Sequence, residues 1–426
     1  MTIRPWYRSS AVYLAIPMVV CLYLYNASWW FSTALAAGPP YLANVLSQAQ
    51  PGILVTSAFI AASATIEGYR YRQSGMGSEP RARSGLELAA RHLWPTFILC
   101  GLAWISAAAQ SAYFGGGAPR FTVVALPLAI VQIIILASWV IVGWVIGSSR
   151  IGPVGIAGAP LLAFVGTGTL RMIPWRGSSV LSGDAINTCC FAPHVPSASA
   201  LTAMAAWSIA IALGFLTVDL STRAWTSPVR FIIGGGSIAL LGASLVLART
   251  TPDPAFDFRA DAPRCTTESG VEVCLFPEQE VLVGDTRKDV GAAAAEFMRA
   301  GINVPTTVTA KPSNTTSTYF FTSPAAIEGP ERSYISALFT PDDSCSLAAG
   351  NNTLINSYSV AVSWGYDLLG MENGHIIASL QGEELTTWQA LMNASKEQQV
   401  AWINAYYTNV RTCVDSVPPI PVDTAS

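Results

Sequence analysis

Long apolar stretches recur along the first 250 residues and then stop. The segments between them are short and polar. Stretches of this length and composition are typical of helices that cross a bilayer, which need about 20 predominantly apolar residues. The pattern predicts an α-helical polytopic membrane bundle of about seven spans, with the first kept as an uncleaved span, near residues 11–25, 53–66, 93–112, 123–146, 153–170, 201–218 and 231–247.

Arginines between these stretches predict the topology. With seven spans and the N-terminus inside, ten of the thirteen arginines before residue 249 fall on the cytoplasmic side. Basic residues flanking spans favour the cytoplasm, so the opposite orientation is disfavoured. We therefore expect a multi-pass protein of the cell membrane with a cytoplasmic N-terminus and an extracytoplasmic C-terminal domain. The ten inner arginines are Arg4, Arg8, Arg70, Arg72, Arg81, Arg83, Arg91, Arg150, Arg223 and Arg230.

Composition supports the same division of the chain. The sequence is 51% hydrophobic and only 12% charged, which is too apolar for an ordinary soluble enzyme. Residues up to Ala248 have thirteen basic and five acidic side chains, whereas the remainder has ten basic and twenty-one acidic ones. An acidic C-terminal part argues against nucleic-acid binding. The expected domains are 1–248 (transmembrane), 249–264 (linker), 265–417 (extracytoplasmic) and 418–426 (disordered tail).

The C-terminal part has the pattern of a small mixed α/β domain. Strands are predicted at 271–276, 304–309 and 317–322, and helices at 288–300 and 357–369. Ser395 and Gln398 have the spacing of a capping box, in which each side chain bonds a free backbone N–H of the first helical turn. The helix that follows places five residues on one face, which we expect to pack inward: Ile403, Tyr406, Tyr407, Val410 and Cys413.

Four of the eight cysteines lie in this domain, an even number suited to an oxidising compartment. Three pairings are open for Cys265, Cys274, Cys345 and Cys413. We prefer Cys265 with Cys274, which bracket a short strand and turn, and Cys345 with Cys413, which would tie the last helix to the core.

Catalytic motifs are nearly absent. The chain has no G-x-x-x-x-G-K-[ST] sequence, so any ATP-driven role requires a partner. His375 could form a metal site with Glu372, Glu383 and Glu384, but a solvated acidic cluster is the more common meaning of such a pattern. Cys189, Cys190 and His194 could likewise bind a metal, although oxidised or paired thiols are favoured. We expect no enzymatic activity, cofactor or metal.

Polar residues within the predicted spans are few. They suit hydrogen bonding between helices better than a substrate path, although both interpretations stay open. No predicted span contains the buried carboxylate or histidine chain expected of a proton-driven pump. The polar residues are Ser57, Ser63, Gln110, Gln132, Ser138, Thr167 and Thr202.

Five short segments resemble uncharacterised actinobacterial membrane proteins, which look like ABC transporter permeases with a C-terminal extracytoplasmic domain of unknown function. The resemblance implies an integral-membrane subunit that works with a separate ATP-binding cassette ATPase. A homodimer or a heterodimer is a further expectation for its assembly. Exporter-type permeases commonly have six spans, so the predicted seven depart from that pattern. The segments are 67–72, 80–84, 149–160, 189–190 and 273–278.

The predicted cytoplasmic loop 68–92 is the candidate surface for the ATPase. Its end can form a short helix with Gly85, Leu86, Glu87, Leu88 and Arg91, in which Glu87 and Arg91 are four residues apart. Alternatively, its arginines only fix the topology and contact anionic lipid. The function we expect is therefore a permease subunit of unknown substrate. The alternatives are a membrane-anchored extracytoplasmic receptor and, less favoured, a metal-dependent extracytoplasmic hydrolase using Glu372, His375 and Glu383.

Overall fold

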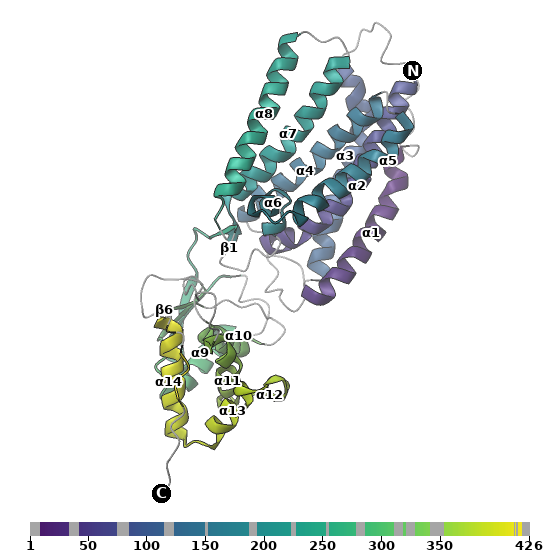
Figure 1. Cartoon of the computed structure of the whole chain (residues 1–426). Coiled ribbons are helices and arrows are strands. Elements are labelled where there is room, and N and C mark those ends of the chain that lie inside the picture. Colours follow the sequence, from purple (N-terminus) through teal and green to yellow (C-terminus); the bar gives the residue numbers. More distant parts are fainter. Residues whose placement is uncertain are drawn as a thin grey trace. The chain divides into compact units, whose positions relative to one another are not determined.

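The computed structural model describes two compact units of the chain, residues 9–259 and 260–419 (Figure 1). The described residues are 9–33, 42–74, 85–114, 123–149, 152–186, 194–222, 227–252, 255–277, 286–310, 318–320, 329–340, 353–412, 414 and 416–419.

Seven long helices form the first unit, and each is apolar and long enough to cross a bilayer. The predicted polytopic bundle is therefore confirmed. At 1.5 Å rise per residue, even the 21 residues of the shortest cover the ~30 Å hydrocarbon layer. The helices are α1 (Ser10–Thr33), α2 (Leu42–Gln73), α3 (Gly85–Phe114), α4 (Leu126–Ser148), α5 (Gly152–Met172), α7 (Ala198–Thr222) and α8 (Ser227–Thr250).

Helix α2 is the central element of the bundle, packed against α1, α3, α4 and α5 (Figure 1). Glycines let α4 approach it closely. A Cβ at Gly147 would lie 2.8 Å from the carbonyl carbon of Thr65, and one at Gly143 would lie 3.1 Å from Cα of Ala61. Small residues at such crossings let two backbones pack closely where no hydrophobic effect drives association.

Short elements connect the long helices. A 3₁₀ turn (η3, Val123–Ala125) precedes α4, whereas the helix α6 (Arg176–Leu181) and the 3₁₀ turn η4 (Asp184–Ile186) follow α5. Strand β1 (His194–Pro196) pairs antiparallel with β2 (Phe256–Phe258). The expected linker, residues 249–264, therefore contains the end of α8, a paired strand and the first residue of the next strand.

A four-stranded sheet with helices forms the second unit, the mixed α/β domain that the sequence predicts. Its strands are β3 (Arg264–Glu268), β4 (Val271–Leu275), β5 (Thr307–Thr309) and β6 (Thr318–Phe320), in this order, with β3–β4 antiparallel and the other pairs parallel. Ser269 and Gly270 both have positive φ, as the tight β3–β4 hairpin turn requires.

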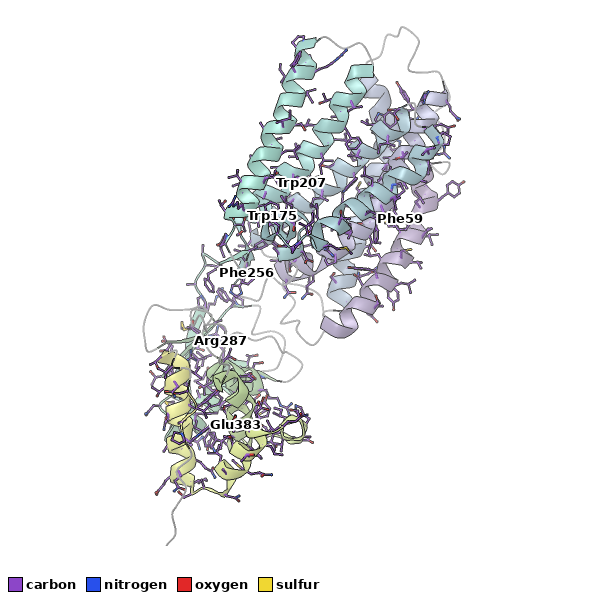
Figure 2. All side chains as sticks on the ribbon, in the orientation of Figure 1. Phe59, Trp175, Trp207, Phe256, Arg287 and Glu383 are labelled. Atoms are coloured by element: carbon purple, nitrogen blue, oxygen red, sulfur yellow. A yellow bond between two sulfur atoms is a disulfide. The ribbon has the colours of Figure 1, made fainter. Side chains whose placement is uncertain are left out.

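Among the described residues, six helices accompany the sheet: α9 (Thr286–Arg299), α10 (Pro330–Phe339), α11 (Thr353–Leu368), α12 (Gly374–Ser379), α13 (Glu383–Asn393) and α14 (Lys396–Thr412). Helix α9 connects the parallel strands β4 and β5, and Arg287 donates to Thr266 Oγ1 of the hairpin at 2.9 Å. Figure 2 shows the side chains of both units and labels Arg287 on α9. Sequence patterns predicted α9, α11 and α14 but not α10, α12 or α13.

The predicted capping box of α14 is present. Ser395 N–H donates to Gln398 Oε1 at 2.9 Å, and Gln398 N–H donates to Ser395 Oγ at 3.3 Å. The predicted inner face, Ile403, Tyr406, Tyr407 and Val410, is buried in the domain core. Trp402 Nε1–H donates to the carbonyl of Pro418 at 2.7 Å, so the expected tail is docked at its first residue.

Candidate functional site

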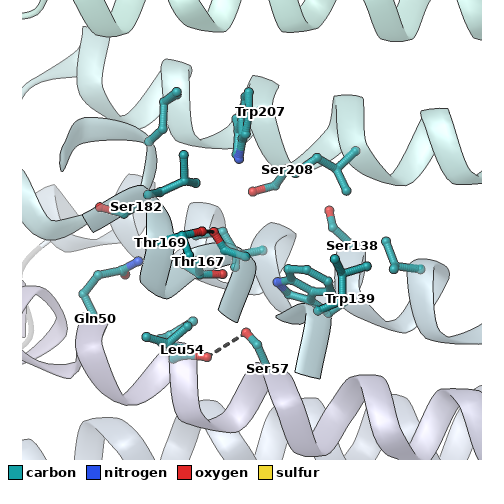
Figure 3. A pocket seen from close by; sticks show the side chains of 18 of the residues that line it. Gln50, Leu54, Ser57, Ser138, Trp139, Thr167, Thr169, Ser182, Trp207 and Ser208 are labelled. Atoms are coloured by element: carbon teal, nitrogen blue, oxygen red, sulfur yellow. Dashed lines mark hydrogen bonds between the residues drawn. The ribbon is translucent and has the colours of Figure 1, made fainter. Parts of the chain in front are cut away.

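A cavity of about 350 Å³ lies inside the membrane bundle, between α2, α4, α5 and α7 and beside the end of α6 (Figure 3). Apolar side chains and two indole rings form most of its wall. Among the described lining residues, none is ionisable. Size and chemistry suit a small, mainly apolar ligand with a few polar groups. The polar lining residues include Gln50, Ser57, Ser138, Thr167, Thr169, Ser182 and Ser208.

The hydroxyl groups in the wall are partnered within their own helices. Ser57 Oγ donates to the carbonyl of Ile53 at 2.7 Å, a bond drawn in Figure 3. Ser138, Thr167 and Ser208 donate in the same way, four residues back. Each hydroxyl proton is thus used, which leaves the oxygen lone pairs as acceptors toward the cavity. Of the predicted polar span residues, Ser57, Ser138 and Thr167 meet here, which favours the substrate-path interpretation for these three.

Gln50 was missed by sequence reasoning. The predicted second span began near residue 53 because polar residues interrupt the apolar pattern before it, whereas α2 begins at Leu42. In the fold, Gln50 is 4% exposed and lines the cavity. Trp139 and Trp207 were also missed, since nothing distinguishes a lining tryptophan from a lipid-facing one before the helices are packed.

The side chain of Gln132 on α4 holds that of Gln50 in place by a hydrogen bond. Its Nε2 donates to Gln50 Oε1 at 3.1 Å and to the carbonyl of Leu46 at 2.7 Å. Its Oε1 accepts from Trp104 Nε1 at 2.9 Å. Gln132 therefore bonds helices together, as the first interpretation of the polar span residues predicted.

The turn after α6 packs against the side chain of Gln50. Gly183 has φ of +77°, and a Cβ at this position would lie 2.8 Å from Gln50 Cγ. Neighbouring Asp184 pairs with Arg171 at 3.6 Å, joining the end of α5 to η4. The turn between α6 and η4 therefore packs directly on the Gln50 side chain.

A second polar cluster ties α1, α2 and α3 together and corrects one expectation. Glu67 is 4% exposed within α2, so a span does contain a buried carboxylate. Its Oε1 accepts from N–H and Oγ of Ser10, both at 2.8 Å, and pairs with Arg70 at 2.8 Å. Ser63 Oγ lies 3.0 Å from Thr96 Oγ1 on α3. The carboxylate thus caps the N-terminus of α1, where the helix dipole favours negative charge.

The candidate coupling segment is the first two turns of α3. Gly85, Leu86, Glu87, Leu88 and Arg91 are helical, as predicted, and their side chains lie outside what the structure describes. Immediately after them, the ring centroid of His92 lies 5.5 Å from that of Tyr71 on α2 and 6.5 Å from that of Trp144 on α4. The segment is therefore continuous with a span that is packed on two others.

The cysteine prediction is confirmed for one pair. Cys265 and Cys274 form a disulfide across the β3–β4 hairpin, where they are directly opposed. Cys345 and Cys413 lie outside the described residues, as do Cys189 and Cys190. His194 is described and packs between the rings of Phe256 and Phe258 in the β1–β2 pair, with centroid distances of 4.7 and 5.0 Å.

The acidic residues near His375 do not form a metal-binding geometry. Within the described part of the chain, three potential ligand atoms come within 4.8 Å of one another only at Cys265, Glu272 and Cys274, where both sulfurs are in the disulfide. Glu372 precedes α12, which holds His375, and Glu383 and Glu384 begin α13. The hydrolase alternative thus gains no support from this geometry.

Comparisons with known proteins match one part of the chain. Residues 273–413 match a family described as a domain of unknown function (DUF7224). No curated protein matches the chain, and no solved structure matches it. The protein is thus a multi-pass membrane protein whose C-terminal domain resembles an uncharacterised family.

Proposed function

We propose that this protein is the membrane subunit of an ATP-driven, ABC-type transporter that works with a separate ATPase. The observation that carries the proposal is the interior cavity of about 350 Å³ among α2, α4, α5 and α7. A bundle that only anchors an outer domain would gain stability by filling such a space, because voids forfeit packing energy. A ligand-sized cavity with polar groups suits a protein that handles a small molecule within the membrane.

Helix α3 supports coupling to an ATPase. It runs without interruption from Gly85 to Phe114, and the rings of Tyr71 and Trp144 hold it near His92. Arg72 also donates to the carbonyl of Ser149, so the ends of α2 and α4 are joined beside this point. Force applied to residues 85–91 would therefore reach three spans, two of which line the cavity.

In the proposed orientation the N-terminus is cytoplasmic and the C-terminal domain extracytoplasmic, in the cell membrane. The arginine bias supports this, and so does the Cys265–Cys274 disulfide, since disulfides persist in oxidising compartments. Reporter fusions after Arg83 and after Ala260 should then read cytoplasmic and external, respectively. Both fusions reporting one side would contradict the topology.

Affinity purification of the full-length protein in mild detergent tests the proposal itself. An ATPase should copurify, and replacing Glu87 and Leu88 with alanine should weaken that copurification while every arginine, and hence membrane insertion, is kept. Tyr113→Ala, at the far end of α3 where the side chain is 76% exposed, is the matched control. Copurification undiminished by the double variant would count against the coupling role, and no ATPase at all would favour the receptor alternative.

A further inference from the structure

The cavity has a defined polarity that follows from a chain of three side chains. Trp104 Nε1–H can only donate, so the atom of Gln132 that faces it must be Oε1. Gln132 Nε2 then faces the Leu46 carbonyl, which can only accept, and Gln50 Oε1. A flipped Gln132 would set donor against donor and acceptor against acceptor. Both amide orientations are therefore fixed by their surroundings.

As a result, Gln50 presents its amide NH₂ group to the cavity. In Figure 3 the nitrogen end of this side chain points into the space between α2, α5 and α6. The side chain is 4% exposed, and within the described part of the chain its Nε2 has no hydrogen-bond partner. A donor that faces a mainly apolar cavity without a partner costs free energy unless water or a ligand accepts its hydrogen bond.

The indole nitrogens of Trp139 and Trp207 also point into the cavity in Figure 3. Their N–H groups can only donate, so a bound ligand can also satisfy them with an acceptor atom. Charged ligands are disfavoured because no described lining residue is ionisable, and burying an unpaired charge is far more costly than burying a neutral polar group.

Apart from Gln50, the two tryptophans and the hydroxyl-bearing residues already named, the wall is apolar, and it continues to the outer surface of the bundle. Leu162 of α5 lines one side and is 42% exposed, whereas Ile211 and Phe215 of α7 line the other. Helix α4 packs against both α5 and α7 and forms the wall between them. A molecule with an apolar body can therefore occupy this part while its polar end lies near Gln50.

We infer that the cavity binds an uncharged amphiphile from the bilayer, with an oxygen acceptor such as an ester carbonyl or a hydroxyl bound by the Gln50 amide. Naming this ligand as transported cargo rests on the proposed function. The binding itself requires only the cavity and its donors.

Photolabelling of the full-length protein in phosphatidylcholine nanodiscs tests this inference. The probe is a monoacylglycerol with a diazirine in its acyl chain, and the comparison probe is the free fatty acid with the same chain at alkaline pH, where it is anionic. We expect the neutral probe to label α5 and α7 peptides and the anionic probe to label them much less. Gln50→Met removes the donor with little change of volume, and should lower labelling at limiting probe roughly 2- to 10-fold.

Two glycines of α5 provide a cavity-filling variant and its matched control. A Cβ at Gly166 meets nothing within 4 Å, and this residue lines the cavity, so Gly166→Leu should fill the space and abolish labelling. Gly158, two turns earlier on α5, also has open space but does not line the cavity, so Gly158→Leu should label normally. Equal labelling by the anionic probe, or labelling unchanged by both Gln50→Met and Gly166→Leu, would overturn the inference.

The two proposals fail separately. Labelling as expected without a copurifying ATPase would leave the ligand site intact and remove the transporter assignment. A copurifying ATPase without specific labelling would support the transporter assignment and overturn the ligand site.

Discussion

Gln132 and Gln50, from α4 and α2, share a hydrogen bond of 3.1 Å that links the interior of the bundle to the wall of the cavity. Gln132→Leu should lower the stability of the bundle by about 1–3 kcal/mol, because Trp104 Nε1–H and the Leu46 carbonyl would each lose a buried partner. Thermal unfolding in detergent measures this loss. Gln110→Leu is the control, since Gln110 is only partly buried and bonds Asn26 and Ser106 elsewhere. An equal loss in both variants would argue against a special role for Gln132.

The close contact between α2 and α4 depends on Gly147. Gly147→Ala would place a methyl group against the backbone of Thr65, which cannot rotate away, so α4 must shift. Such overpacking should cost about 1–3 kcal/mol. Gly158→Ala, where a Cβ meets nothing within 4 Å, should be neutral or slightly stabilising. Size-exclusion profiles after a temperature series would rank the two variants, and similar profiles would contradict the packing argument.

Glu67 holds the start of α1 against α2. Glu67→Ala would leave Ser10 N–H and the Arg70 guanidinium without the carboxylate that they contact, at a cost of roughly 1.5–3 kcal/mol. Glu67→Gln keeps an acceptor oxygen and should lose less. Limited proteolysis at the N-terminus, compared between the two variants, reports whether α1 has loosened. If Glu67→Ala is no more susceptible than the wild type, the carboxylate does not anchor α1.

Burial of His194 should make the β1–β2 pair sensitive to acid. Desolvation lowers the pKa of His194 from 6.5 to about 4, so the paired strands favour the neutral imidazole. Its contribution to stability is complete above about pH 6.5 and is lost as the pH falls from there through about 4. Hydrogen exchange at Val195 and Asp257, corrected for the intrinsic rate, should rise over this interval. His194→Phe should remove the pH dependence, and a rise on the alkaline side instead would contradict the sign.

The β3–β4 hairpin should depend on its disulfide. The bond closes a loop with a sequence separation of nine residues, and the chain-entropy description gives a stabilisation of up to roughly 3 kcal/mol. Replacing Cys265 and Cys274 together with serine should lower the unfolding midpoint of the C-terminal domain by a matching amount. Ser395→Ala serves as the comparison elsewhere in the domain. It removes the helix cap of α14 and should lower the stability of the domain by about 0.5–2 kcal/mol. Mass mapping that joined Cys265 to a different cysteine would contradict the pairing.

Sequence patterns alone predicted the seven spans, the α/β character of the C-terminal domain and the α14 cap, and they favoured the Cys265–Cys274 pair among three possible pairings. Each of these depends on residues close together in the chain. Hydropathy accumulates over about 20 consecutive residues, a capping box spans four, and a hairpin places nearby cysteines opposite each other. The docking role proposed for Glu87 and Leu88 stays a prediction, because it concerns a partner.

Which polar residues share a site depends on how the helices pack against one another. Gln50, Trp139 and Trp207 come from three helices, and Glu67 became a buried cap for α1 only when α1 packed against α2. The sequence could not distinguish a cavity-lining Ser57 from the network-forming Ser63, which follows it on the same helix. The surroundings of each face of an apolar helix depend on which neighbours it meets and at what angle, and these are set by packing between segments distant in sequence.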